Sequence, residues 1–119
     1  MSDKGYNGWT NYETWLVNLW IDNDGYSEYL NERAQECLNK AFEDDSEQTD
    51  DEIRNDATYA LSKAIEEYHD ELQEELNMPS AGVFSDMLNA AFREVNWYEI
   101  AEHMVADAEM PVRETEDAE

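Results

Sequence analysis

Charge constrains the fold of this chain more than any other feature of its sequence. The chain carries 31 Asp and Glu against 7 Lys and Arg, a formal net charge of -24 over 119 residues. Like charges repel more strongly as a chain condenses, so a compact state needs an apolar core that offsets this repulsion. Hydrophobic residues make up 41% of the chain and aromatic residues 12%. Because disordered acidic segments are poor in aromatics, we predict a folded domain.

Apolar residues recur at helical spacing in the first half of the chain, and the four Gly and two Pro are too few for a turn-rich all-β fold. Thr10 and Glu13 have capping-box spacing, which predicts a helix that ends near Asp22. The turn residues 23–25 precede a second predicted helix, from Ser27 to about Glu43. The apolar faces of these two helices are Tyr12, Trp15, Leu16, Leu19 and Trp20, then Leu30, Ala34, Cys37, Leu38 and Ala41.

Three more helices are predicted in the second half. Thr49 and Glu52 repeat the capping-box spacing and open a helix over about 50–76, which ends before Pro79. A fourth helix follows Ser80, and a cap at Asn96 opens a fifth. Their apolar faces are Ile53, Ala57, Leu61, Ala64, Ile65, Tyr68, Leu72 and Leu76; Val83, Phe84, Met87, Leu88, Ala91 and Phe92; and Trp97, Ile100, Ala101, Met104 and Val105. The predicted fold is all-α, a compact single-domain bundle of about five helices over 1–110 with a frayed acidic tail at 111–119.

Several functional classes are disfavoured by composition. Cys37 is the only cysteine, which excludes an intramolecular disulfide and a Cys-based zinc site, and we expect it as a small buried hydrophobe. We expect no signal peptide and no apolar run near the ~20 residues that span a bilayer, hence a cytoplasmic protein. The negative charge disfavours direct contact with nucleic acid or with an anionic membrane.

Acidic residues form columns on two of the predicted helices and gather in the loop between them. Side chains four residues apart lie on one helix face. Glu28, Glu32 and Glu36 therefore form one column. The longest helix carries two neighbouring columns, which are Glu66, Asp70 and Glu74, and Glu67, Glu71 and Glu75. We predict that these columns and the loop form a partner-binding surface that consists of Glu28, Glu32, Glu36, Glu43, Asp44, Asp45, Glu47, Glu66, Glu67, Asp70, Glu71, Glu74 and Glu75.

These columns carry an energetic cost that points to a use. Like charges four residues apart destabilise a helix by a few tenths of a kcal/mol per pair, whereas alternating signs would stabilise it. The helical rise places successive carboxylates about 6 Å apart, a scale comparable to the phosphate repeat along a DNA strand. The acidic first turn 50–52 counts less, since anions there favour the helix dipole. The columns thus favour a surface that substitutes for a nucleic-acid backbone.

Two resemblances sharpen this interpretation. The run from Tyr6 to Trp15 (YNGWTNYETW), continued by LWIDN at 19–23, resembles the opening of small acidic proteins carried by phages and mobile elements. The whole-chain profile resembles anti-CRISPR proteins and, as a second choice, anti-restriction proteins that act as DNA mimics. This resemblance implies a non-enzymatic inhibitor that blocks the DNA-binding surface of a bacterial defence complex. The expected target is a type I CRISPR surveillance complex, with type I-C as the most specific expectation.

Two other interpretations of the acidity stay open. A salt-adapted surface is also acidic and poor in lysine, and the chain has three Lys. Clustering favours mimicry over salt adaptation, since a salt-adapted surface spreads its acids evenly. The other alternative is a different basic protein as partner. In either binding interpretation, charge discriminates poorly among basic partners, so exposed aromatics such as Tyr26, Tyr29 or Tyr59 would supply selectivity.

Candidate metal and catalytic motifs are weak. Glu66 and His69 have the Glu-x-x-His spacing of di-iron bundles, but no second such motif exists. We expect His69 at the surface, with a pKa raised by its acidic neighbours. The loop 22–25 fails the EF-hand pattern. No catalytic triad, phosphate-binding glycine loop or metalloprotease motif is found, so we expect no enzymatic activity, metal or cofactor, and we assign the aromatic segment 6–20 mainly to the core.

Overall fold

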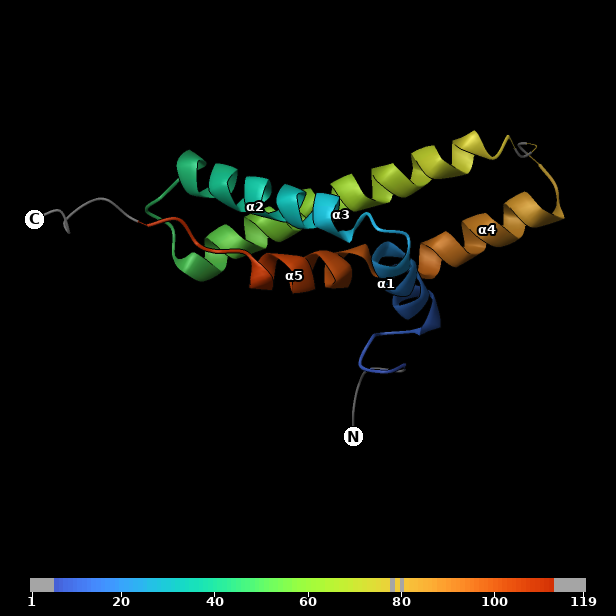
Figure 1. Ribbon diagram of the computed structural model, residues 1–119, viewed down its shortest axis with the longest axis horizontal. Helices are drawn as coiled ribbons and strands as arrows, with labels where there is room; N and C mark the ends of the chain where they lie inside the picture. The colour runs from blue at the N-terminus through green and yellow to red at the C-terminus, as the bar shows by residue number, and fades with distance from the viewer. Residues whose placement is uncertain (1–5, 78, 80, 113–119) are drawn as a thin grey trace, which may run out of the picture.

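The computed structural model describes residues 6–77, 79 and 81–112. The described residues form five helices (Figure 1): α1 (Tyr12–Asn23), α2 (Ser27–Asp44), α3 (Asp50–Glu75), α4 (Val83–Glu94) and α5 (Trp97–Asp107). The predicted all-α single domain is confirmed. Extended pairing within the described residues is limited to an isolated bridge between Tyr6 and Trp9.

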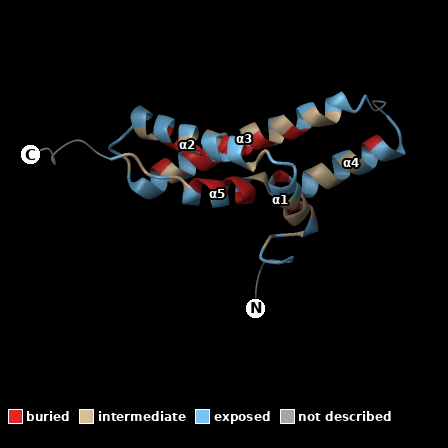
Figure 2. Cartoon of the chain, viewed as in Figure 1, coloured by how far each residue is buried: buried red, intermediate tan, exposed pale blue. Residues whose placement is uncertain are grey.

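The apolar core lies where α2, the first part of α3 and α5 pack against one another. Their buried faces, red in Figure 2, follow the predicted helical spacing. The core consists of Leu30, Ala34, Leu38, Ala41, Ile53, Ala57, Leu61, Ile65, Ile100, Ala101, Met104 and Val105, with Ile21 and Val95 at one end. Cys37 is half-buried at the edge of this core rather than fully buried as predicted.

The capping predictions are confirmed at two helices and wrong at a third. The capping box of α3 forms with both hydrogen bonds, Glu52 N–H to Thr49 Oγ1 and Thr49 N–H to Glu52 Oε1, each 3.1 Å. Asn96 caps α5 by accepting from the Glu99 N–H. At α1, however, the cap is Asn11, which accepts from the Thr14 N–H at 2.9 Å.

The aromatic face predicted for α1 is not core. Tyr12 is 46% exposed and Trp20 50% exposed, and the buried residues of the helix are Thr14 and Ile21. The helix lies against one end of the bundle and turns the side that holds Thr14 and Ile21 inward. The rings of Tyr6, Tyr12 and Trp15 instead pack on one another, with centroids 4.9–5.6 Å apart.

The far end of α3 and most of α4 project beyond the core (Figure 1), and Phe92 near the end of α4 packs against it. Helix α3 has 26 residues, against 18 in α2 and 11 in α5, so at roughly 1.5 Å per residue its partners are too short to cover it. Leu76, predicted to be buried, is accordingly 63% exposed. Helix α4 contacts α1 more than it contacts α3, and its buried residue is the polar Ser85.

Candidate functional site

The carboxylates predicted to bind a partner lie at the surface. Every one of them is exposed except Glu66, which is half-buried. On α2 the column of Glu28, Glu32 and Glu36 occupies the side opposite the buried Leu30, Ala34 and Leu38. Arg33 forms an ion pair with Glu36 at 3.3 Å, and the two side chains are 40% and 67% exposed.

The two columns of α3 are neighbours on the helix but line different depressions. Glu67 and Glu71 lie in a shallow groove of about 140 Å³ between α2 and α3, together with Tyr29 and Arg33. Asp70 and Glu74 line the cleft between α3 and α4. Carboxylates of α3 therefore face two sides of the helix, and only Glu67 and Glu71 lie close to α2.

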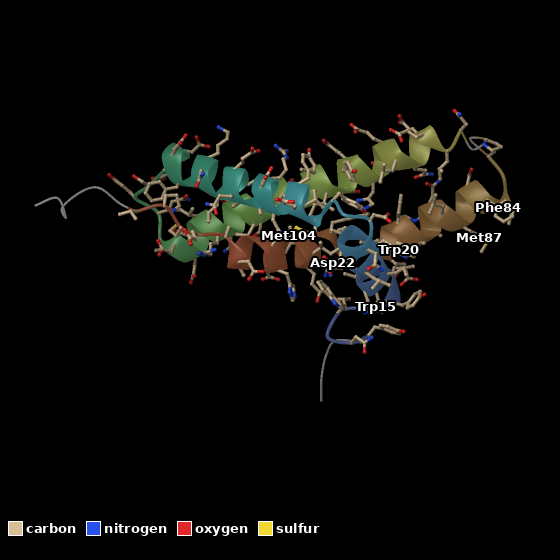
Figure 3. The ribbon with its side chains drawn as sticks, viewed as in Figure 1. Trp15, Trp20, Asp22, Phe84, Met87 and Met104 are labelled. Atoms are coloured by element: carbon tan, nitrogen blue, oxygen red, sulfur yellow. The ribbon has the colours of Figure 1, made fainter. Side chains whose placement is uncertain are left out.

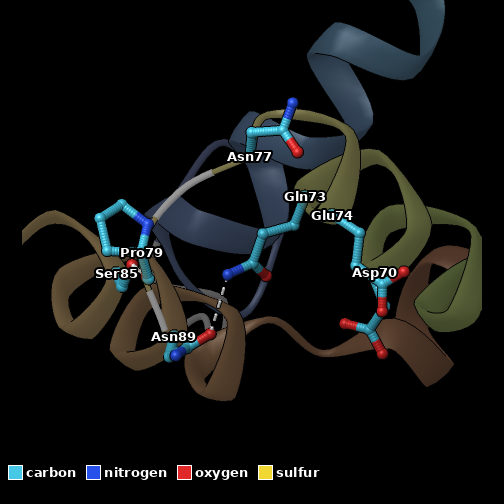
Figure 4. Close-up of a pocket in the computed structure, with 7 residues that line it drawn as sticks. All are labelled: Asp70, Gln73, Glu74, Asn77, Pro79, Ser85 and Asn89. Atoms are coloured by element: carbon cyan, nitrogen blue, oxygen red, sulfur yellow. Dashed lines mark hydrogen bonds between the residues drawn. The ribbon is translucent and has the colours of Figure 1, made fainter. Parts of the chain in front are cut away.

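The α3–α4 cleft has a volume of about 440 Å³ and a polar lining (Figure 4). A hydrogen bond from Gln73 Nε2 to Asn89 Oδ1, 3.2 Å long, bridges its two walls. Beside it, Ser85 donates to the Pro79 carbonyl and ties the start of α4 to the segment that follows α3. The lining offers carboxylate and amide oxygens, which are acceptors for ammonium or guanidinium groups.

Four of the predicted residues, Glu43, Asp44, Asp45 and Glu47, lie in the last turn of α2 and the connection after it. Glu43 and Asp44 belong to its last turn rather than to the loop, and Lys40 pairs with Asp44 at 3.5 Å. Asp45 accepts from the Glu47 N–H at 3.1 Å, which shapes the turn into α3. Because this turn and the α3–α4 cleft lie at opposite ends of the molecule (Figure 1), the predicted set extends along the molecule instead of forming one patch.

Acidic side chains are also exposed outside the predicted set. Asp22 on α1, Asp86 on α4, and Glu102 and Asp107 on α5 all face solvent. Arg54, one of the few cations, is committed to the interior, since its guanidinium donates to the carbonyls of Val105 and Ala108 at the end of α5. Negative charge is therefore present on every helix, and the columns of α2 and α3 are its densest runs.

Sequence reasoning missed a polar network that joins the two ends of the chain. Glu99 is the buried carboxylate of the described residues, and its Oε1 accepts from the Thr10 N–H at 3.0 Å. Thr14 Oγ1 accepts from the Asn96 N–H at 2.8 Å, and Asn11 Nδ2 donates to the Glu94 carbonyl at 2.7 Å. The helix starts of α1 and α5 thus complete each other. The distinctive sequence around Asn11 was the one signal of this network, and these residues have a structural role in it.

The prediction for His69 is wrong. The residue is buried, and burial lowers the pKa of its imidazole, against opposing effects of the Ile65 carbonyl and the Asp70 charge. Nδ1 lies 2.9 Å from the Ile65 carbonyl, which can only accept, so Nδ1 carries the proton and Nε2 accepts from the Tyr26 hydroxyl at 2.8 Å. Both ring nitrogens are thereby occupied, which removes His69 as a metal ligand.

Tyr26 is correspondingly half-buried, and its hydroxyl is bound to His69 rather than free to contact a partner. Burial, with smaller effects of Tyr68 and Asp24, raises the pKa of Tyr26 to about 12. Tyr29 and Tyr59 are exposed. Nowhere in residues 6–77, 79 and 81–112 do three or more His, Cys, Asp or Glu side chains converge as a metal site would require.

The comparisons with known proteins give a family but no activity. A family model matches residues 2–117, a range that includes all five helices. The chain belongs to DUF7249. This is a family of unknown function, so membership in DUF7249 does not distinguish among the interpretations of the acidic surface. The searches of curated proteins and of solved structures found no match. Over the part of the chain that the structure describes, no helix combines the length and apolar character that crossing a membrane requires.

Proposed function

We propose that this protein is a non-enzymatic binding module that offers its acidic helices to a Lys/Arg-lined surface in place of DNA. The observation that carries the proposal is the set of solvent-facing carboxylate columns on α2 and α3. The target is the DNA-binding surface of a bacterial defence complex, with a type I CRISPR surveillance complex first and a restriction enzyme second. Its site of action is the cytoplasm of the host bacterium.

The mechanism is competition for a cationic channel. The carboxylates would take the positions of phosphates and displace the anions and water bound there. A net charge of -24 attracts such a channel over a distance and accelerates encounter by roughly 10-fold to 1,000-fold at low salt. Since the Debye length falls to about 8 Å at physiological ionic strength, the attraction weakens steeply as salt is added.

The decisive experiment is a competition assay. We would measure DNA binding by a purified surveillance complex with and without the protein. Loss of DNA affinity in proportion to added protein supports mimicry, and a ternary complex with unchanged DNA affinity contradicts it. The triple variant Glu67→Lys, Glu71→Lys, Glu75→Lys should abolish inhibition. A matched variant with the same charge change on the α5 side, Glu102→Lys, Asp107→Lys, Glu109→Lys, should retain most of it.

A second candidate is supported by the exposed acids on α1, α4 and α5. Under this alternative the protein is a salt-adapted or structural acidic domain, or one that binds another basic protein. A salt-adapted domain would unfold at low salt and regain its fold in molar salt, because screening relieves its self-repulsion. Thermal melts followed by circular dichroism in the two conditions separate this candidate from a mimic that is folded in both.

A further inference from the structure

Helix α4 exposes an apolar face that no part of the described chain covers. Val83 and Met87 are each 63% exposed, and Phe84 is 76% exposed. Their positions in the helix place them on one side, roughly opposite Ser85 and Asn89, which face the cleft toward α3. Figure 3 shows Phe84 and Met87 at the end of α4 that lies far from the core.

This exposure is costly for the isolated protein. Helix α4 has 12 residues, and helices of that length are marginal in water without tertiary packing. Contiguous apolar residues on a surface commonly mark an interaction site. An amphipathic helix with one free apolar side is one half of a helix-packing interface, which a second amphipathic segment completes.

Charge selects the occupant. A second copy of this chain would bring another -24 charges to the contact, and an anionic membrane would also be repelled. Asp86 and Glu94 flank the apolar face on α4 itself. A segment that fits carries apolar side chains for Phe84 and Met87 and cationic side chains at its margins.

We propose that the apolar face of α4, made of Val83, Phe84 and Met87, is the docking site for a cationic amphipathic helix of the basic partner. This proposal rests on the proposed function, because it assumes a basic protein as target. The apolar face adds selectivity, which charge alone does not supply, because an apolar anchor distinguishes one basic partner from another.

The test uses two synthetic probes and the full chain. One probe is a fluorescent helical peptide of about 18 residues with Leu on one face and Lys on the other, five turns long. The other has the same composition with Leu distributed around the helix. Fluorescence anisotropy at low and moderate salt gives the affinity of each. The protein variants are Phe84→Ser, Met87→Ser as a pair and, as the matched control, Tyr98→Ser, Val112→Ser, which removes exposed apolar groups elsewhere.

We expect the amphipathic peptide to bind at least about 10-fold more tightly than the permuted one, which corresponds to about 1.4 kcal/mol. The α4 variant should abolish this difference and leave the salt-dependent binding that both peptides share. The control variant should retain the difference.

Other outcomes separate the two proposals. Equal binding of the two peptides overturns the α4 proposal and leaves the acidic-surface function standing. Absence of binding by either peptide at low salt contradicts both. Two further results would also overturn the α4 proposal. One is a dimer in sedimentation that the α4 variant loses and the control keeps, which would make a second copy the occupant. The other is binding to phosphatidylcholine vesicles with the same dependence on the variants, which would make a lipid surface the occupant.

Discussion

The two ends of α3 lie in opposite surroundings. Toward its start, Ile53, Leu61 and Ile65 are fully buried between α2 and α5. Toward its end, Leu76 is mostly exposed, and an open polar cleft separates the helix from α4. One regular amphipathic helix therefore has a packed part and an exposed part. The part of α3 as far as His69 supplies stability, while its C-terminal end carries carboxylates and the exposed Leu76, which the core does not use.

This difference shows how the protein tolerates its charge. Burial of apolar surface, mostly in α2, α3 and α5, offsets the repulsion among the carboxylates. The rest of the chain contributes little to this burial. Apolar residues outside the core, at Phe84 and Met87, are then available for a partner. The following substitutions test the division, from the largest expected effect to the smallest.

The largest difference is expected when a buried and an exposed leucine of the α3 region are each truncated to alanine. Leu61→Ala should lower the free energy of unfolding by about 2–5 kcal/mol, because a fully buried side chain leaves a cavity. Leu76→Ala should lower it by less than about 0.5 kcal/mol, since that side chain is in solvent. Urea unfolding monitored by circular dichroism measures both. Equal losses would show that the C-terminal end of α3 is also packed in solution, which would contradict the difference between the two ends of the helix.

Arg54 tests whether the packed half also depends on polar contacts. Arg54→Met should cost about 1–3 kcal/mol of unfolding free energy, because the carbonyls of Val105 and Ala108 lose their donor. Lys63→Met, an exposed cation on the same helix, is the control and should change stability by less than about 0.5 kcal/mol. A loss no greater than that of the control would mean that the end of α5 needs no cap from α3.

His69, at the end of the packed part of α3, predicts a pH dependence of stability. Burial lowers its pKa in the folded state, so between the ordinary histidine value of about 6.5 and that lowered value the unfolded chain binds more protons. The stability contributed by neutral His69 is therefore present above about pH 6.5 and is lost as the pH falls through the folded pKa. The difference in unfolding free energy between the protein and its His69→Gln variant should shrink on acidification. A difference that stays constant from pH 7 to pH 5 would contradict the buried neutral imidazole.

The acidic columns should give the smallest effect on stability. Glu67→Gln with Glu71→Gln removes a like-charge pair at i, i+4 and should raise the unfolding free energy by a few tenths of a kcal/mol at low salt. The gain should vanish in molar salt, where the repulsion is already screened. Thermal melts in both conditions measure it. A stability loss on neutralisation would mean that these carboxylates support the fold and are not spare groups on its surface.

Local patterns predicted the elements well because helix starts and stops depend on nearby atoms. The capping box at Thr49 and Glu52 lies within one turn, and the end of α3 before Pro79 follows from backbone sterics. Residues whose environment comes from distant segments were predicted poorly. The sequence near His69 is acidic, yet its ring contacts Tyr26, 43 residues away, and packs near Trp97. The solvent exposure of the columns was foreseeable, whereas their division between two depressions was not.

The sequence by itself determined that the chain is helical, where its five helices run and that their charge must face outward, because periodicity, caps and like-charge repulsion act within a few turns. Only the tertiary structure decided which apolar faces are buried. Tyr12, Trp20 and Phe84 belong to stripes as regular as that of Leu61, but burial requires an opposing surface. The lengths of α2 and α5 supply that surface for α3 as far as His69 and leave Val83, Phe84 and Met87 of α4 without one.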